Sequence, residues 1–362
     1  MDYKNPTGII RTETVPKGTI RWKSPSNIAL IKYWGKFPVQ MPRNPSISFT
    51  LDAAYTETTL KYSPRKDDHT GIDLKFYFEG SENQAFSARI EKFLTSLIPI
   101  FPFLRQLSLE IHSKNSFPHS SGIASSASSM SALALCLCTL EEQVLDLDLE
   151  NEEFDRKASY VARLGSGSAC RSIFSEAALW GKLNDFEGSS DEYAVPLGNE
   201  LHKTFKGFRD WIFLVSSEKK SVSSSKGHEL MDSNDFSEAR YVQARKKSHV
   251  LLDYLRHGKV EEAGKIIEEE ALTLHGLMMC SRPGFILMEP ETIELIRGIQ
   301  RYREDSGVQL YFTLDAGPNV HLLFHEKDEK HVERFITTEF SQYLEPGRII
   351  RDKVGSGPVQ LD

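Results

Sequence analysis

The chain has 362 residues, of which 40% are hydrophobic and 26% charged, and its formal net charge is −7. This length favours two fused lobes over one core, and the composition is typical of a globular enzyme. The negative charge and the lack of a basic stripe argue against a nucleic-acid surface. No apolar run is long enough to span a membrane, so we expect no membrane association.

The cysteines and the first residues indicate the compartment. Only four cysteines are present, and Cys136, Cys138, Cys170 and Cys280 do not have the spacing of a zinc site. The opening segment, MDYKNPTGIIRTETVPKG, is polar and interrupted by prolines, unlike a secretory signal. We therefore expect a cytoplasmic protein.

The first lobe, residues 1–205, is predicted to open with antiparallel strands, because its early apolar residues alternate with polar ones. Helical periodicity follows, with short strand-like segments between the helices. In chain order the predicted elements are strands at 19–24, 46–62 and 72–80, a helix near 85–100, a strand at 108–113, helices at roughly 124–142 and 151–164, a helical start at 165–172 and a strand at 177–181.

The second lobe, residues 206–362, is predicted to be rich in helices, and its last residues are candidates to pack back on the first lobe. Its predicted elements are a buried strand at 210–218, helices at about 234–256, 259–279 and 291–305, and two strands within 308–326. Helices and strands in both lobes predict an α+β architecture, with the ligand in the cleft between the lobes.

A loop of small residues at 118–128, PHSSGIASSAS, precedes the helix at 124–142. Gly122 lets the backbone approach a ligand, Ser125 and Ser126 supply hydroxyls, and the N–H groups of the first helical turn point at an anion. The same residues are also typical of an ordinary loop capped by serine. From this segment alone, a phosphate site and a capped loop both remain open.

Any anion site must be local, because the chain as a whole is acidic. Basic residues beside glycine, serine or aromatic residues are the candidates, although isolated lysines usually lie on solvated surfaces. They are Lys32, Lys36, Lys114, Arg171, Lys219, Lys220 and Lys226. The Walker A sequence is absent, and GSGSAC at 165–170 lacks the third glycine of a dinucleotide-binding fingerprint.

PHSSGIASSAS resembles the phosphate loop of the GHMP kinase superfamily. The segments NIALIKYWGK, GSGSACRS, SVSSSKG, TLDAGPN and KVGSGP resemble, in this order, the diphosphomevalonate decarboxylase family, and the similarity runs from about residue 18 to 358. The resemblance implies the GHMP kinase fold. This fold has a ribosomal-S5-like N-terminal domain, an α/β sandwich C-terminal domain and an active site in the cleft between them.

The resemblance also implies an activity in the mevalonate pathway of isoprenoid biosynthesis. It implies the ATP-dependent decarboxylation of (R)-5-diphosphomevalonate to isopentenyl diphosphate, with release of ADP, phosphate and carbon dioxide. A tertiary hydroxyl is a poor leaving group, so its phosphorylation precedes decarboxylation. ATP is the implied co-substrate, Mg²⁺ the implied ion, and a homodimer the implied assembly.

The resemblance implies roles for individual residues. Asp315 would orient or deprotonate the 3-hydroxyl, Lys32 would keep this carboxylate ionised, and Arg171 would hold the substrate carboxylate. The other implied substrate contacts are Tyr33, Lys36, Ser166, Ser168 and Ser224, and the implied nucleotide contacts are Gly122, Ala124, Ser125, Ser126 and Lys220. Ser125 or Ser126 would meet the metal through Mg-ATP. By position alone, Asp315 is equally well explained as a turn-capping residue, and Trp34 is best explained by core packing.

The chain departs from the family pattern at two places. After Lys36, Phe37 and Pro38 begin a segment about two residues shorter than usual, and His228 stands where methionine is common. Related enzymes that decarboxylate the monophosphate, or that only phosphorylate mevalonate, share much of this framework and are the alternatives. A non-catalytic RNA-binding protein is a further alternative, against which the net acidity argues.

Overall fold

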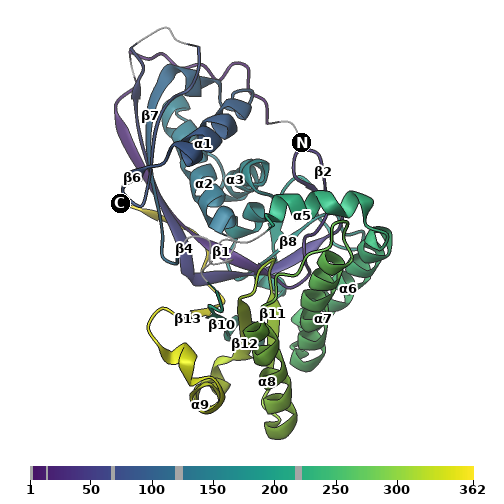
Figure 1. Ribbon diagram of the computed structural model, residues 1–362. Coiled ribbons are helices and arrows are strands. Elements are labelled where there is room, and N and C mark those ends of the chain that lie inside the picture. Colours follow the sequence, from purple (N-terminus) through teal and green to yellow (C-terminus); the bar gives the residue numbers. More distant parts are fainter. Residues whose placement is uncertain (1–2, 14, 67–69, 119–124, 217–221) are drawn as a thin grey trace.

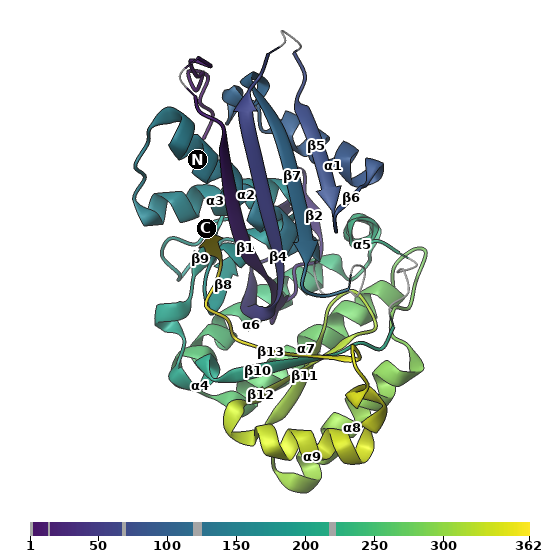
Figure 2. The same ribbon diagram turned by 90° about the vertical axis from the view of Figure 1, so that its left-hand side faces the viewer.

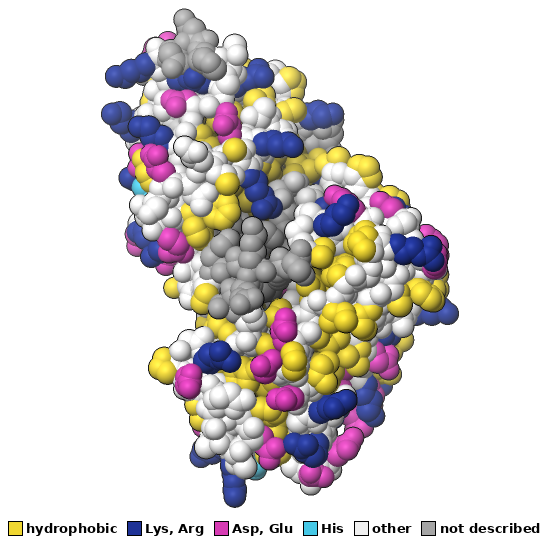
Figure 3. Space-filling view, in the orientation of Figure 1, with side chains coloured by type: hydrophobic (Ala, Val, Ile, Leu, Met, Phe, Trp, Pro, Cys, Tyr) yellow, Lys and Arg dark blue, Asp and Glu magenta, His cyan; other side chains and the backbone are white. Residues whose placement is uncertain are grey.

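The computed structural model describes residues 3–13, 15–66, 70–118, 125–216 and 222–362. Two lobes of mixed helix and sheet lie one above the other (Figure 1). Within the described ranges, no helix combines the length and the apolar character needed to cross a membrane. On the face seen in Figure 3, basic and acidic side chains are interspersed.

The N-terminal lobe contains an eight-stranded sheet in which β1 and β4 form the longest pairing. The order is β14-β1-β4-β7-β5-β6, and β8 pairs with both β4 and β9. The strands are β1 (Gly18–Ala29), β4 (Ser46–Pro64), β5 (Asp73–Phe78), β6 (Ser81–Glu82), β7 (Leu107–Asn115), β8 (Ala177–Trp180), β9 (Ala194–Pro196) and β14 (Val359–Leu361). Most pairs are antiparallel, as predicted, but β5 runs parallel to β7.

Three helices cover one face of this sheet, namely α1 (Gln84–Ser96), α2 (Ser125–Leu145) and α3 (Asn151–Gly165) (Figure 2). The central helix, α2, is buried over most of its length because it packs against the sheet and α3. Cys136 and Cys138 lie within this core and are fully buried. Their spacing on the helix therefore reflects packing.

The C-terminal lobe is built on a four-stranded antiparallel sheet in the order β11-β12-β10-β13. Its elements are β10 (Phe208–Phe213), β11 (Leu310–Leu314), β12 (Val320–His325), β13 (Ile349–Lys353), α6 (Ser237–His257), α7 (Val260–Met279), α8 (Pro290–Ser306) and α9 (Glu329–Glu339). Alternate residues of β10 face two cores. Ile212 packs with residues of α6 and α7, whereas Trp211 packs with residues of α8 and α9.

Local sequence signals set the ends of the long helices. Pro290 occupies the first turn of α8, where a missing N–H costs nothing, and the side chains of Glu289 and Thr292 form a reciprocal capping box. Gly307 ends α8 and Gly258 ends α6, each with a positive φ that glycine adopts without strain.

The lobes share a hydrophobic core and a returning chain end. Ile28, Ile47 and Phe49 of the first sheet belong to the same buried cluster as Ile212 and Leu252 of the second lobe. After β13, the chain crosses back, and β14 pairs with β1 in antiparallel register. The two lobes are therefore joined by packing as well as by covalent connection.

Several short elements were not predicted. They include the hairpin of β2 (Lys36–Phe37) and β3 (Met41–Pro42), α4 (Lys203–Lys206), α5 (Ser224–Leu230), and the strands β6, β9, β13 and β14. The longer helix α9 was also not predicted. The predicted helical start at 165–172 is a 3-10 helix at Gly167–Ile173. Elements of two to seven residues span too few periods to show a hydrophobic pattern.

Candidate active site

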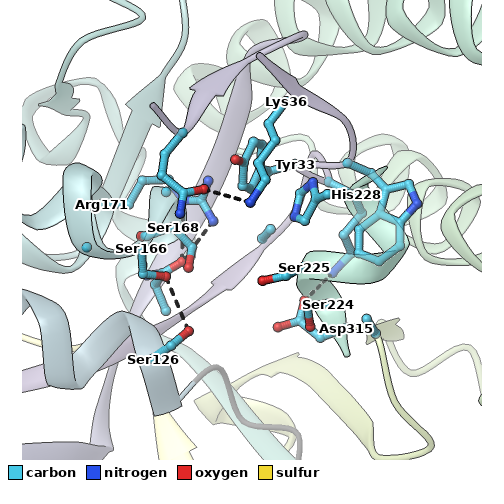
Figure 4. Close-up of a pocket in the computed structure, with 18 of the residues that line it drawn as sticks. Tyr33, Lys36, Ser126, Ser166, Ser168, Arg171, Ser224, Ser225, His228 and Asp315 are labelled. Atoms are coloured by element: carbon cyan, nitrogen blue, oxygen red, sulfur yellow. Dashed lines mark hydrogen bonds and ion pairs between the residues drawn. The ribbon is translucent and has the colours of Figure 1, made fainter. Parts of the chain in front are cut away.

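A cleft collects residues from β1, the segment after it, α2, the 3-10 helix, α5 and the β11–β12 turn (Figure 4). Most of the predicted catalytic and substrate-binding residues line it. The lining residues used below are Asn27, Lys32, Tyr33, Lys36, Gln40, Arg89, Ser126, Ser166, Ser168, Arg171, Ser224, Ser225, His228 and Asp315. Arg89 of α1 also lines the cleft, so segments far apart in the sequence meet at one site.

Lys32 and Asp315 form an ion pair across the two lobes. Lys32 Nζ donates to Asp315 Oδ1 at 3.2 Å. The lysine side chain is 2% exposed and the aspartate side chain 25% exposed, so only the carboxylate is open to the cleft. Burial lowers the pKa of Lys32, while the charge of Asp315 opposes that change.

The backbone of Lys32 is held by a second, fully buried ion pair. Arg240 of α6 donates to both carboxylate oxygens of Glu270 of α7, at 2.8 and 2.6 Å. Glu270 accepts a hydrogen bond from Lys32 N at 3.0 Å, and Arg240 donates to Lys32 O at 3.1 Å. The second lobe thus fixes the peptide groups on both sides of the lysine side chain.

Arg171 is buried and oriented by two side chains of the sheet. Its Nε and Nη2 donate to Asn27 Oδ1 at 3.3 and 3.1 Å, and Nη1 donates to Ser46 Oγ at 2.8 Å. A guanidinium group has five N–H donors, so two remain for a ligand in the cleft. A planar fork held in this way suits a carboxylate.

The end of α3 and the following 3-10 helix place two serines at the cleft. Ser166 ends α3 in an extended conformation, and its Oγ lies 3.2 Å from Ser126 Oγ in the first turn of α2. The backbone carbonyl of Ser168 accepts a hydrogen bond from Asn27 Nδ2 at 3.1 Å. These contacts connect the start of α2, the end of a helix that can bind an anion, to the segment carrying Arg171.

Tyr33, Lys36 and Ser224, for which substrate contacts are predicted, also line the cleft. Tyr33 Oη is buried and has no hydrogen-bond partner among the described residues. Burial lowers the pKa of Lys36, and the charge of Glu229 partly offsets the change. Trp34 is 3% exposed and packs in a small core with Tyr241 and Leu274, in agreement with the packing interpretation.

Two candidate cations lie away from the cleft. Lys114 is exposed and pairs with Glu57 at 2.8 Å, and Lys226 is exposed and pairs with Glu229 at 3.2 Å. The predicted nucleotide contacts Gly122, Ala124 and Lys220 lie outside the described residues. Ser125 begins α2 and lines the cavity next to the cleft.

Sequence reasoning missed several lining residues, namely Gln40, Arg89, Ser225 and His228, and gave Asn27 no role. Asn27 lies in a segment that was singled out, but its function is to orient Arg171, which is 144 positions away. Gln40 lies in the unpredicted hairpin. For His228, the departure from the family pattern was the available signal.

An apolar cavity adjoins the cleft and shares Arg89 and Ser126 with it. Its other lining side chains come from β4, β5, β7, α1 and α2, and they are largely aromatic or aliphatic. They include Phe76, Phe78, Phe86, Ile111, Met130 and Leu133. A flat apolar ring joined to an anionic group would fit the two adjoining spaces.

Two family models match the chain in the order of its lobes. Residues 24–194 match the diphosphomevalonate decarboxylase-like N-terminal domain, and residues 211–359 match the mevalonate 5-diphosphate decarboxylase C-terminal domain. The chain belongs to the diphosphomevalonate decarboxylase family. Membership confirms the fold predicted from the sequence, with two lobes and a mixed α+β architecture.

Relatives and solved structures agree with this membership. The diphosphomevalonate decarboxylase of Candida albicans is 28% identical over 93% of the chain and 96% of the relative. The phosphomevalonate decarboxylase of Haloferax volcanii is 27% identical over 84% of the chain and 87% of the relative. The mevalonate diphosphate decarboxylase structure from Staphylococcus aureus has a TM-score of 0.81 at 28% identity and covers 97% of this chain and 100% of that one.

A further solved structure carries ligands. This structure shows MDDEF in complex with MVAPP, AMPPCP and magnesium. Its TM-score is 0.78 at 28% identity, and the match covers 96% of this chain and 100% of that one. The family assignment therefore rests on similarity along nearly the whole chain.

Proposed function

We propose that this protein catalyses the ATP-dependent decarboxylation of (R)-5-diphosphomevalonate to isopentenyl diphosphate. The observation that carries the proposal is the convergence of the Lys32–Asp315 pair and the oriented Arg171 in one cleft. A kinase needs a base or a positioning carboxylate near the accepting hydroxyl, and a decarboxylase also needs a group that holds the carboxylate.

The chemistry has two stages. Asp315 orients the 3-hydroxyl and takes its proton while the 3-oxygen attacks the γ-phosphorus of ATP, which releases ADP. The bond between C3 and the phosphorylated oxygen then breaks, and inorganic phosphate leaves. The electrons of the bond between the carboxylate and C2 form the new double bond, and carbon dioxide departs. Lys32 balances the negative charge at the reacting oxygen.

Arg171 holds the substrate carboxylate until that group leaves. Two of its N–H donors remain after the bonds to Asn27 and Ser46. We expect Tyr33, Lys36, Ser166, Ser168 and Ser224 to contact the rest of the substrate. These roles are supported by their shared position in the cleft.

MgATP would occupy the other side of the cleft. The first turn of α2, with Ser125 and Ser126, would meet the phosphates, and the adjoining apolar cavity would accept the adenine ring. The described residues include no cluster of three histidine, cysteine or acidic side chains that could bind a metal alone. This agrees with an ion held largely by nucleotide phosphates, and Mg²⁺ would supply neutralising charge there.

The substrate assay tests the function directly. We expect MgATP and 5-diphosphomevalonate to yield carbon dioxide and isopentenyl diphosphate, with much slower turnover of mevalonate and its monophosphate. Formation of ADP without carbon dioxide would instead identify a kinase. Faster turnover of the monophosphate would assign the activity named for the Haloferax volcanii relative.

Arg171→Lys separates carboxylate recognition from nucleotide binding. Lysine lacks the fork that Asn27 and Ser46 orient, so we expect kcat/KM for decarboxylation to fall by about 10–100-fold, the equivalent of one or two charged hydrogen bonds. The KM for MgATP should change little. Arg301→Lys, on an exposed arginine paired with Glu339, is the matched control. Wild-type kinetics in Arg171→Lys would contradict the carboxylate assignment.

A cytoplasmic homodimer completes the proposal. The location is supported by four free cysteines, three of which are buried. Light scattering of the purified protein tests the assembly, and a monomeric mass would exclude the dimer.

A further inference from the structure

The β2–β3 hairpin, which begins at Lys36, has an unusual turn. Val39 and Gln40 have φ values of 59° and 61°, so two consecutive residues other than glycine adopt the left-handed region. This conformation is costly for a β-branched residue such as valine. Strained backbone of this kind persists only where the surrounding structure enforces it, and it occurs often at ligand sites.

A buried arginine enforces the turn. Arg163, in the last turn of α3, is 2% exposed, and its Nη1 donates to the carbonyl of Val39. Its Nε donates to the carbonyl of Glu192 at 2.6 Å, so the guanidinium group is fixed at both ends. The turn is therefore tied to the helix that leads into Ser166 and Ser168.

The consequence of the turn is the position of the Gln40 side chain. Lys36 Nζ donates to Gln40 Oε1 at 2.9 Å, and both residues line the cleft. Because an ammonium group can only donate, this contact identifies the amide oxygen and leaves both N–H bonds of Gln40 Nε2 available. The pair thus offers ammonium and amide donors side by side.

His228 adds a neutral donor beside this pair. Its Nδ1 accepts a hydrogen bond from Gly35 N at 3.0 Å, and its ring packs against those of Tyr33 and Trp34, at centroid distances of 4.4 and 4.7 Å. Burial and the charge of Lys36 lower the pKa of His228 to about 3, so the ring is neutral at physiological pH. A neutral imidazole that accepts at Nδ1 carries its proton on Nε2.

The hydrogen-bond donors of Lys36, Gln40 and His228 lie away from Asp315, the proposed site of the chemistry. Figure 4 shows His228 beside Tyr33 and Lys36 on one side of the cavity, with Asp315 on the other. Tyr33 Oη, which is buried and has no partner in the part of the chain that the structure describes, adds a further hydroxyl. A group rich in oxygen and negative charge is what such a set of donors binds.

We propose that Gln40 and His228 are specificity-determining residues that recognise the terminal phosphate of the substrate, with Gln40 also holding Lys36 in place. This inference rests on the proposed function, because it takes the substrate to be a phosphorylated acid. It adds to the proposed site two residues to which the family resemblance gave no role.

Substitutions can separate recognition of the terminal phosphate from the support that Gln40 gives to the Lys36 side chain. Gln40→Glu keeps the length of the side chain and its acceptor for Lys36, but it replaces the N–H donors with an oxygen and a negative charge. Gln40→Asn tolerates the positive φ but is one methylene too short to reach Lys36. His228→Asn can still accept from Gly35 N, but it lacks the donor at the position of Nε2.

The experiment is titration calorimetry without nucleotide, using 5-diphosphomevalonate and 5-phosphomevalonate as separate ligands. We expect Gln40→Glu and His228→Asn each to weaken diphosphate binding by about tenfold or more, the equivalent of a hydrogen bond to a charged group. The monophosphate should lose less, and the unfolding temperature of Gln40→Glu should stay close to the wild-type value. Gln40→Asn should weaken diphosphate binding as well.

Unchanged diphosphate affinity in Gln40→Glu and His228→Asn would overturn the inference. Equal losses for both ligands would also overturn it, because a merely structural role does not distinguish the phosphates. The outcome is independent of turnover. Wild-type protein that binds the diphosphate but releases no carbon dioxide would contradict the proposed function and leave the binding comparison valid.

Discussion

Asp315 is the acidic side chain of the cleft that pairs with a buried lysine. Its neighbour Lys32 lies almost wholly out of solvent, so the pair orients the carboxylate without closing it off from the cleft. Because the pair joins residues 283 positions apart, it forms only when the two lobes are assembled. The catalytic step that we propose therefore depends on how the lobes pack.

Asp315→Asn tests this residue. The amide keeps the size of the side chain but cannot take the proton of the 3-hydroxyl, so we expect kcat to fall by about 10²–10⁴-fold. Affinity for 5-diphosphomevalonate should remain close to that of the wild type, as measured by calorimetry. Asp305→Asn, on an exposed aspartate at the end of α8, is the control. Full turnover in Asp315→Asn would remove Asp315 from the chemistry.

At the scale of elements, α7 carries a run of three glutamates whose environments differ. Glu269 is exposed, with a side chain 64% accessible, whereas Glu270 is fully buried against Arg240. Burial alone would raise the pKa of Glu270, but the charges of Arg240 and Lys247 outweigh it and the pKa is lowered. The helix thus contributes a buried anion that holds the backbone of Lys32.

Glu270→Ala should destabilise the fold strongly. It leaves the Arg240 charge buried without its partner, so we expect a loss of about 3–5 kcal/mol in the free energy of unfolding at pH 7. Glu269→Ala, on the exposed neighbour, should cost no more than about 1 kcal/mol. Urea denaturation of the two variants measures the difference.

The stability that Glu270 contributes should also depend on pH. Because its folded-state pKa is lowered, the contribution is complete above the ordinary glutamate pKa and is lost as the pH falls through the folded value. The gap between wild type and Glu270→Ala should therefore narrow in acid. A gap that stays constant down to pH 3 would contradict the assigned ion pair.

The same elements show what the sequence could predict. Long periodic segments such as β4 and α6 were found because their apolar residues repeat over many positions. Glu270 could not be recognised as buried, since a glutamate run is typical of a solvated helix face and its partner lies 30 positions away. The β2–β3 hairpin was missed because each strand has two residues, and its shape depends on Arg163.

At the site, the residue types allowed the chemistry to be predicted, but they did not predict the geometry. Lys32, Arg171 and Asp315 stood out as charges in segments of small residues, and the structure brings all three to the cleft. Asn27 and Ser46, which orient Arg171, carry no charge and lie far from it in the sequence. Such supporting contacts are set by the tertiary fold, which local patterns do not encode.

At the scale of the whole molecule, the end of the chain fastens the two lobes. The Asp352 carboxylate, in β13, accepts hydrogen bonds from the backbone N–H groups of Asp52, Ala53 and Ala54 of β4 at 2.7–2.8 Å. Gly355 N donates to Thr50 O at 2.9 Å. Further along the chain, β14 pairs with β1 of the first lobe. Because Lys32 and Asp315 come from different lobes, these contacts between the lobes also help to keep the two side chains in register.

Gly355→Ala tests the fastening. A Cβ at Gly355 would lie 2.1 Å from Leu51 O and 3.0 Å from Asp52 N, so the returning segment must move away from β4. We expect a loss of about 1–3 kcal/mol in the free energy of unfolding, the usual cost of overpacking. Gly276→Ala is the matched control, since among the described residues no atom outside the local helix backbone lies within 4 Å of a Cβ at this position in α7. It should stabilise the helix by up to about 1 kcal/mol. Calorimetric unfolding measures the stability of both variants. If Gly355→Ala is as stable as the wild type, the returning segment can move without weakening the contact between the lobes, and the prediction is wrong.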